Sequence, residues 1–170
     1  MIKYSKVIAL ALLIAAVFCL LPGCGGKPAG GLAAIQDKGV LTVATSPDFP
    51  PFESLENGEV AGIEVDILEK IAESLGVTLQ IEQMDFESVI PGVQAGKFDV
   101  GMSGITITEK RKENVDFSEP YFLAAQTIVV PAGSGISCKA DLDGKKISVQ
   151  TGTTAEDYCM ENGYDVLAFT

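Results

Sequence analysis

The 170-residue sequence contains no histidine and no tryptophan, and its basic residues are few. Without histidine the chain lacks the commonest general base and the commonest protein ligand for metals, which lowers the expectation of an enzyme. Lys and Arg number 12 against 23 Asp and Glu, a formal net charge of −11. Nucleic-acid binding depends on neutralising phosphates, so this charge argues against a nucleic-acid partner. We expect no metal and no cofactor.

An uncharged run stands near the start of the sequence. Lys3 and Lys6 precede residues 7–21, which carry no charge. A membrane-spanning helix needs about 20 apolar residues, and this shorter run has the length of a signal-peptide core. The letters LPGCGG at 21–26 resemble a bacterial lipoprotein signal, which implies removal of residues 1–23 and a lipid on Cys24. The alternative is ordinary secretion, with Cys24 as a bystander.

Cysteine is scarce in the remainder of the chain. Besides Cys24, only Cys138 and Cys159 follow the predicted signal peptide. Disulfides persist in exported proteins, so these two residues either form a bridge or remain two free thiols. They are too few, and too far apart, to indicate a zinc site.

The first part of the exported chain alternates between helix and strand. Residues 24–34 include GGKPAGG and are typical of a flexible tether. Within residues 35–125 the pattern predicts strands at 40–45, 77–81 and 97–102, and helices at 64–75 and from 86 to about 93. Gly76 is a helix stop and Asp85 a helix cap. Short links between these elements predict a parallel α/β sheet with right-handed crossovers.

The pattern then begins again in residues 126–170. We expect strands at 126–130, 146–150 and 165–170, a turn at 141–144 and a helix at 153–162. A strand is stable only beside other strands, so a unit that closes on one looks incomplete.

Several stretches resemble the bacterial extracellular solute-binding proteins of family 3, which bind polar amino acids. They are LTVATSPDFPPFE at 41–53, GIEVDILEKIAESLG at 62–76, MDFESVIPGVQAGKFDVGMSGITITEKR at 84–111, VDFSEPY at 115–121 and DLDGKKISVQTGTTAED at 141–157. The resemblance implies an α/β fold, the two-lobe periplasmic-binding-protein fold of type II. Residues 35–125 would form lobe 1, and residues 126–170 an incomplete lobe 2.

The resemblance also implies partners and a location. We expect a free amino acid as ligand, a permease of the ABC type, a lipid anchor on the outer face of the cytoplasmic membrane, and a monomer. The sequence looks like the first two thirds of such a protein, although a naturally short, one-lobe relative is the alternative. We therefore expect the 170-residue chain by itself to bind its ligand weakly or not at all.

Arg111 is the residue best suited to hold the carboxylate of an amino acid. It follows GITITEK at 104–110, just past a predicted strand end, where open α/β sheets place their ligands. A guanidinium group meets a carboxylate through two parallel hydrogen bonds. The alternative is a surface arginine paired with Glu109 or Glu113, and the family resemblance favours the ligand.

The resemblance carries further ligand contacts over to this chain. In lobe 1 they are Ser103, Gly104 and Thr106, with Phe49 and Phe86 as an aromatic wall; in lobe 2 they are Gln150 and Thr154. Thr106 is otherwise explained by strand propensity, and the two phenylalanines by core packing. If Arg111 and Thr154 hold one carboxylate from two lobes, ligand binding would close the cleft.

The identity of the ligand is less defined. Ser46 occupies a position where several relatives carry an acid that faces the ligand side chain. Its neutrality argues against a strictly cationic substrate and favours uncharged or acidic polar amino acids. Two alternative functions remain: a dehydratase of cyclohexadienyl compounds, for which Asp48 and Asp85 are the nearest acids, and the sensing domain of a receptor.

Overall fold

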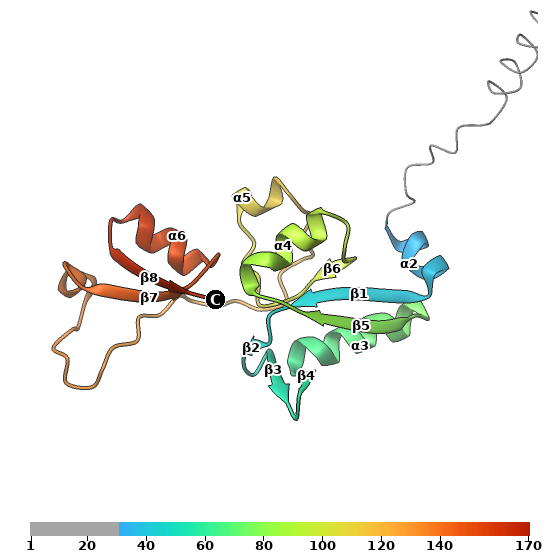
Figure 1. The fold of residues 1–170 in the computed structure, drawn as a ribbon, viewed down its shortest axis with the longest axis horizontal. Helices are drawn as coiled ribbons and strands as arrows, with labels where there is room; N and C mark the ends of the chain where they lie inside the picture. Colours follow the sequence, from blue (N-terminus) through green and yellow to red (C-terminus); the bar gives the residue numbers. More distant parts are fainter. Residues whose placement is uncertain (1–30) are drawn as a thin grey trace, which may run out of the picture. The chain divides into compact units, whose positions relative to one another are not determined.

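The computed structural model describes residues 31–170, and its compact unit runs from Ile35 to Thr170 (Figure 1). The predicted signal peptide and Cys24 lie outside the described residues. In the described part, no helix is long and apolar enough to cross a membrane. The same part holds no cluster of three or more His, Cys, Asp or Glu side chains that could bind a metal ion.

A parallel sheet forms the centre of the first half of this unit. Strand β1 (Val40–Thr45) lies between β5 (Thr78–Gln83) and β6 (Val100–Gly101), as the alternating pattern predicted. Strand β6 is shorter than the predicted strand at 97–102. The reason is local, because the Thr42 N–H donates to the Asp99 carboxylate at 2.8 Å instead of to a backbone carbonyl.

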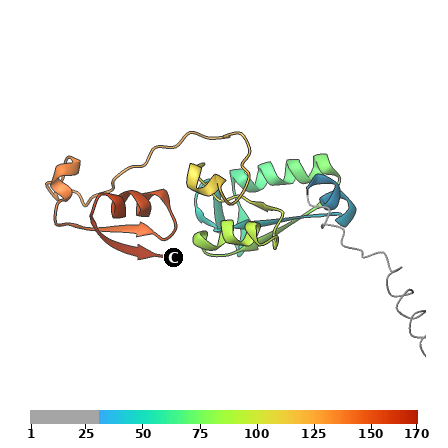
Figure 2. The ribbon, with the colours of Figure 1, turned by 90° about the horizontal axis from the view of Figure 1, so that it is seen from above.

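Two helices cover opposite faces of this sheet: α3 (Ile63–Leu75) and α4 (Phe86–Gln94) (Figures 1 and 2). Gly76 closes α3 in the left-handed conformation, with φ 69°, as predicted. Helix α4 begins after Asp85, also as predicted, but the Asp85 side chain makes no capping hydrogen bond. A short helix, α2 (Leu32–Lys38), precedes β1.

The core lies between β1 and α3. Leu41 and Val43 of β1 pack with Leu68 and Ala72 of α3 and with Met102, and none of these side chains is more than 9% exposed. Burying a Leu or Val side chain stabilises the fold by about 1.5–3 kcal/mol. On the other face, Val89 of α4 lies against Gly101, where a Cβ would come within 2.8 Å of Val89 Cγ1.

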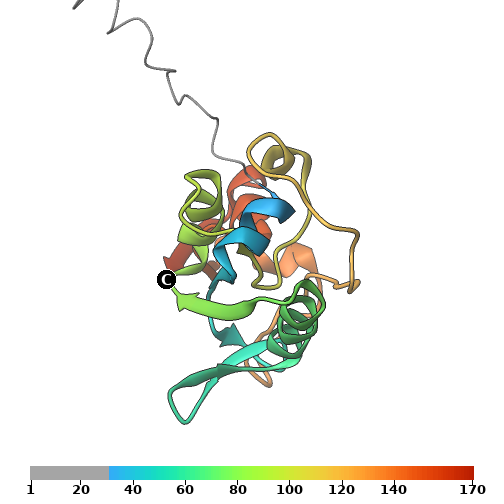
Figure 3. The same ribbon diagram turned by 90° about the vertical axis from the view of Figure 1, so that its right-hand side faces the viewer.

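A small antiparallel sheet follows β1 and was not predicted. It consists of β2 (Asp48–Phe49), β3 (Glu53–Glu56) and β4 (Glu59–Ala61), and β3 and β4 form a hairpin beside α3 (Figure 3). Asn57 and Gly58 form its turn with φ of 55° and 89°. Two positive φ values in succession are typical of tight hairpins.

The second parallel sheet agrees closely with its prediction. Strands β7 (Lys146–Gln150) and β8 (Asp165–Phe169) are joined by α6 (Thr154–Glu161), with a 3-10 turn, η1 (Lys139–Leu142), before them. The strand predicted at 126–130 was wrong. Those residues form an irregular connection (Figure 2), with Val129 91% exposed. They have strand-forming side chains but, in the described chain, no strand beside them.

Cys138 and Cys159 are free cysteines in this structure, so the alternative of a bridge between them is not realised. Cys159 is buried in α6, whereas Cys138 is exposed at the start of η1. Its thiol donates to the Asp141 carboxylate at 3.4 Å.

Candidate functional site

The carboxyl ends of β1 and β6 are tied together by serine. The Ser46 N–H donates to Ser103 Oγ at 3.0 Å, and the Ser103 hydroxyl lies 3.0 Å from the Glu53 carboxylate. Both serines are buried, with 4% and 3% exposure. Ser103 thus positions the strand ends, and its contact with a ligand stays a prediction.

Gly104 and Phe49 form the next part of this edge. Gly104 has φ 55°, and a Cβ there would lie 2.9 Å from Phe49 Cδ1, so the ring lies directly against the backbone. The Phe49 ring is half exposed and stacks on Phe52, with centroids 5.5 Å apart. Phe122 packs edge-on against Phe52 at 4.8 Å. Phe49, Phe52 and Phe122 therefore form an aromatic cluster at this edge. The wall of Phe49 and Phe86 around a ligand stays a prediction.

Arg111 lies in the short helix α5 (Glu109–Lys112), whose N-cap is Thr108. Its guanidinium group is half-buried and donates to the Thr106 carbonyl oxygen at 2.7 Å and to the Gly152 carbonyl oxygen at 2.9 Å. It lies 5.6 Å from the centre of the Phe86 ring. Thr106, Gly152 and Phe86 thus meet at the Arg111 cation.

The surface ion pair considered for Arg111 is not formed. Glu109 pairs with Lys112 at 2.8 Å, and no ion pair of the described residues includes Arg111. Burial lowers the pKa of Arg111 and the negative charge of Asp157 opposes that effect. The ordinary pKa of an arginine side chain is so high that Arg111 remains a cation. Its two carbonyl contacts use two of five N–H groups, which leaves donors for an anion.

The start of α6 faces the same region. Thr153 is its N-cap, and its hydroxyl accepts from the Glu156 N–H at 3.3 Å. The Gly152 N–H donates to the Glu156 carboxylate at 2.7 Å, so a carboxylate already occupies this helix start. Thr154, the predicted contact, is the first residue of α6 and is half-buried.

Gly152 brings this segment close to α4. It has φ 76°, and a Cβ there would lie 2.9 Å from Glu87 Cβ. Only glycine combines this backbone conformation with so close an approach.

Gln150 and Asp48 make a contact that the sequence did not indicate. Gln150 Nε2 donates to Asp48 Oδ2 at 2.6 Å, across 102 residues of sequence. A shallow hollow opens beside them, lined by Asp48, Ser148, Val149, Gln150, Phe169 and Thr170. A further ion pair, Lys110 to Asp157 at 3.2 Å, links α5 with α6.

Two buried acids support the same edge of the sheet. Glu53 and Glu64 are each 1% exposed. Glu64 Oε1 accepts from the Gly104 N–H at 2.9 Å and from the Tyr121 hydroxyl. Burial, followed by the neighbouring Glu64, raises the pKa of Glu53 to about 9. Burial and the Glu64 carboxyl also raise the pKa of Tyr121.

Sequence reasoning missed these acids, although one signal was present. Glu64, Leu68 and Ala72 are the buried residues of α3 and recur at intervals of four. An acid that continues a buried helical stripe needs a specific partner, which is a reason to single it out.

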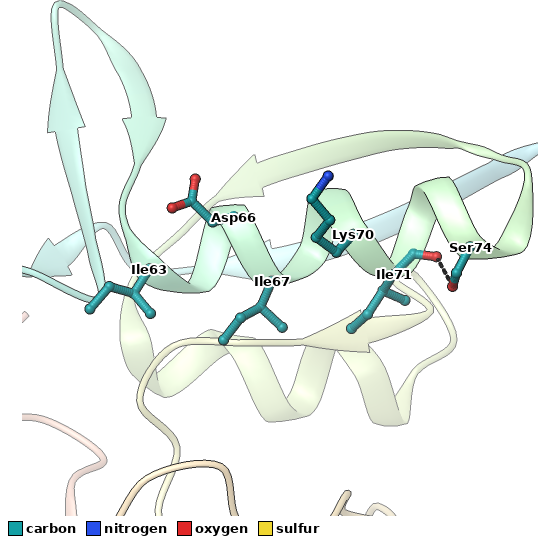
Figure 4. A pocket seen from close by; sticks show the side chains of 6 residues that line it. All are labelled: Ile63, Asp66, Ile67, Lys70, Ile71 and Ser74. Carbon is teal, nitrogen blue, oxygen red and sulfur yellow. Dashed lines mark hydrogen bonds between the residues drawn. The ribbon is translucent and has the colours of Figure 1, made fainter.

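Another hollow lies on α3, where Ile63, Ile67 and Ile71 follow one another along the helix (Figure 4). Asp66, Lys70 and Ser74 complete its lining. None of these residues was predicted to contact a ligand.

Comparison with known proteins settles the family. Residues 41–167 match the model of the bacterial extracellular solute-binding proteins, family 3. The chain belongs to this family. The α/β periplasmic-binding-protein fold predicted from the resemblance is confirmed by the solved structures it matches.

Among its relatives is a probable histidine-binding protein of Neisseria gonorrhoeae. The two are 37% identical over 155 residues, which cover 89% of this chain and 57% of the relative. The arginine-binding extracellular protein ArtP of Bacillus subtilis (strain 168) is 34% identical over 148 residues, or 87% of this chain and 57% of ArtP. The chain thus spans little more than half the length of these relatives.

A solved structure gives the same picture. The arginine-bound form of truncated ArgBP from T. maritima superposes with a TM-score of 0.76 at 45% identity. The match covers 81% of this chain and 66% of that one.

Proposed function

We propose that this family 3 member binds a free amino acid outside the cytoplasm, with Arg111 holding the α-carboxylate. The observation that carries this proposal is the state of Arg111. Its guanidinium group is half-buried, is fixed by the carbonyl oxygens of Thr106 and Gly152, and has no acid paired with it among the described residues. A fixed cation without a protein anion is suited to a ligand anion.

The energetics favour a carboxylate at this place. Each charge-assisted hydrogen bond contributes about 1.5–3 kcal/mol, and an arginine fork makes two in parallel. The start of α6 adds backbone N–H groups, where Thr154 is the predicted contact. The Glu156 carboxylate now bound to the Gly152 N–H is an internal stand-in that a ligand carboxylate would replace.

The ammonium group of the ligand requires acceptors on the opposite side. The Gly104 carbonyl and the Thr106 hydroxyl are our candidates, and Phe49 and Phe86 would enclose the body of the ligand. The half-exposed ring of Phe49 supports this arrangement.

For the ligand side chain we now propose a cationic group, with arginine as the first candidate. Ser46 is buried and bonded to Ser103, so its neutrality says little about the ligand. Asp48 is exposed beside Gln150 and supplies a negative charge at the hollow between β2 and β7. Relatives named for arginine and histidine support the same choice.

The wider role follows from the family. We propose that residues 35–125 and 126–170 act as two lobes, that an amino acid bridges them, and that the loaded protein delivers it to an ABC-type permease. A lipid on Cys24 would keep the protein at the outer face of the membrane. The relatives named above are binding proteins, which supports this role over a dehydratase.

The test is calorimetric titration of the complete mature protein, without its lipid cysteine, with each of the twenty amino acids, alongside Arg111→Ala. We expect one or a few ligands, L-arginine among them, and a loss of at least about 100-fold in the variant, since two charged hydrogen bonds disappear. Lys112→Ala is the matched control, because among residues 31–170 Lys112 forms an ion pair only with Glu109. Equal binding by Arg111→Ala and wild type would remove the proposal.

A further inference from the structure

The acids Glu53 and Glu64 are an unusual feature of the support beneath the proposed site. Both carboxyl groups are 1% exposed, one at the start of β3 and one in the first turn of α3. Neither takes part in an ion pair of the described residues. Two buried like charges without a cation are strongly unfavourable, so at least one group must be neutral.

In each of the two carboxyl groups, one oxygen has hydrogen-bond donors in the described part of the chain and the other does not. Each carboxyl has one oxygen with donors: Glu53 Oε1 receives the Ser103 hydroxyl, and Glu64 Oε1 receives the Gly104 N–H and the Tyr121 hydroxyl. The second oxygen of each, Oε2, is buried and has no partner among the described residues. The Glu53 and Glu64 side chains are within hydrogen-bonding reach of each other. One proton between the two carboxyl groups would turn this deficit into a hydrogen bond.

We propose that Glu53 and Glu64 are positioning residues that share a single proton, and that this pair holds the Ser103–Gly104 turn in the shape the amino-acid site requires. Glu53 holds the proton and Glu64 remains the acceptor. The role in the site rests on the proposed function, whereas the shared proton does not.

The surroundings of the pair favour this assignment. Besides each other, Glu53 and Glu64 face two titratable groups: Asp48 from β2 and Tyr121 from the segment after α5. Asp48 adds negative charge near Glu53, which keeps the proton there. Glu64 receives two donors on Oε1, which makes it the acceptor of the pair.

The pair is connected directly to the proposed ligand contacts. The Gly104 N–H is fixed by Glu64, and the carbonyl of Gly104 is our candidate for the ligand ammonium. Ser103, which bonds Glu53, also holds the end of β1 through the Ser46 N–H. Loss of the proton would leave two buried negative charges next to each other. Their repulsion would move this turn.

The first experiment follows the stability of the protein with pH, without any ligand. The pKa of Glu53 is raised to about 9 from an ordinary value near 4.5, so the stabilisation is complete below about pH 4.5 and is lost as the pH rises through about 9. The urea midpoint of the wild type should fall between pH 6 and 9. With no histidine in the chain, few other groups titrate in this range.

Glu53→Gln is the key variant because its amide keeps a donor toward Glu64 at every pH. Its carbonyl can accept from Ser103, and its urea midpoint should stay nearly constant from pH 6 to 9. Glu64→Gln should also fold, since its carbonyl can accept from Gly104 and Tyr121 while its amide donates to an ionised Glu53.

The double variant separates a shared proton from two independent acids. In the double variant Glu53→Gln, Glu64→Gln, both amide carbonyl oxygens already accept from Ser103, Gly104 and Tyr121. The two amide N–H groups would then face each other without an acceptor between them. The loss of stability should therefore exceed the sum of the losses in the single variants. Additive losses, or a pH dependence of Glu53→Gln equal to wild type, would overturn the shared proton. If the variants do not fold, the infrared spectrum of the wild type at pH 7 provides the test. A band of a protonated carboxyl group is expected, and its absence would contradict the shared proton.

A titration of the complete mature protein with L-arginine at pH 6 and pH 9 tests the role in the site. The wild type should lose affinity at pH 9, and Glu53→Gln should lose much less. Equal losses in the two proteins would overturn the positioning role. No binding of L-arginine at either pH would instead count against the proposed function, and the stability experiment would still decide the shared proton.

Discussion

The guanidinium group of Arg111 donates a hydrogen bond of 2.9 Å to the carbonyl oxygen of Gly152, 41 residues further along the chain. The same guanidinium holds the Thr106 carbonyl at 2.7 Å. One side chain of α5 therefore joins the end of the first parallel sheet to the start of α6. A ligand that binds Arg111 would be in contact with both segments, which is the geometry that a hinge mechanism needs.

Replacing Arg111 by Lys should weaken binding even though the charge is kept. Lysine has a point charge in place of a planar fork and cannot hold Thr106, Gly152 and a carboxylate together. We expect an affinity for L-arginine lower by about 10–100-fold, the equivalent of one charge-assisted bond. Calorimetry measures this directly, with Lys110→Arg as control. Unchanged affinity of Arg111→Lys would show that the fork does not matter.

Replacing Asp48 by Asn should change the preference for the ligand side chain. Asp48 accepts from Gln150 at 2.6 Å, and asparagine retains an acceptor but removes the charge. We expect the ratio of affinities for L-arginine and L-glutamine to fall by about 3–10-fold, because charge pairs near solvent contribute little more than about 1 kcal/mol. Asp85→Asn is the control, since Asp85 makes no capping bond. A ratio equal to wild type in Asp48→Asn would place the ligand side chain elsewhere.

Gly104→Ala should destabilise the protein more than Gly96→Ala does. Both glycines have positive φ, of 55° and 69°, so both variants incur backbone strain of about 1–2 kcal/mol. At Gly104 the new Cβ also meets Phe49 at 2.9 Å, whereas at Gly96 no neighbouring atom of the described part of the chain lies within 4 Å. Overpacking adds about 1–3 kcal/mol in urea unfolding. Equal losses in the two variants would mean that Phe49 moves aside without cost.

Asp99 should stabilise the fold at neutral pH and lose this effect in acid. Burial alone raises the pKa of Asp99, but hydrogen bonds from Lys38 and Thr42 outweigh it, and the net pKa is lowered from 3.8. The stabilisation is therefore present above about pH 3.8 and is lost as the pH falls below it. The Asp99→Asn variant should have a lower unfolding free energy than wild type at pH 7. This difference between the two proteins should shrink near pH 2–3.

The control for Asp99 is Glu73→Gln, which removes an exposed pair with Lys70. Such pairs contribute about 0–1 kcal/mol, so that variant should remain close to wild type. An Asp99→Asn protein that is as stable as Glu73→Gln at pH 7 would contradict the importance of the Thr42 and Lys38 contacts.

Hydrophobic periodicity predicted the regular elements of this fold well where each is long. Helix α3, strands β1 and β7, and helix α6 agree with the sequence within a residue or two, because their buried stripes and caps are local signals. The strand predicted at 126–130 failed because strand formation depends on a neighbour that local sequence does not reveal. The β3–β4 hairpin is short and polar, with little periodicity to detect.

The sequence indicates only those parts of the candidate site that lie close together along the chain. Arg111, Gly104 and Thr106 could be proposed because they occur in one continuous motif that resembles the family. The Asp48–Gln150 contact and the Glu53–Glu64 pair join residues far apart in sequence or on different elements, so no spacing rule indicates them. Whether the predicted residues touch a ligand remains a prediction.

The central claim is that Arg111 holds the carboxylate of an amino acid, and the most direct test is to remove that carboxylate from the ligand. Titrating the protein with L-arginine and with agmatine, which lacks only the α-carboxylate, isolates this group. We predict at least about 100-fold weaker binding of agmatine to wild type, and a much smaller difference in Arg111→Ala. Equal affinity of wild type for the two ligands would contradict the account.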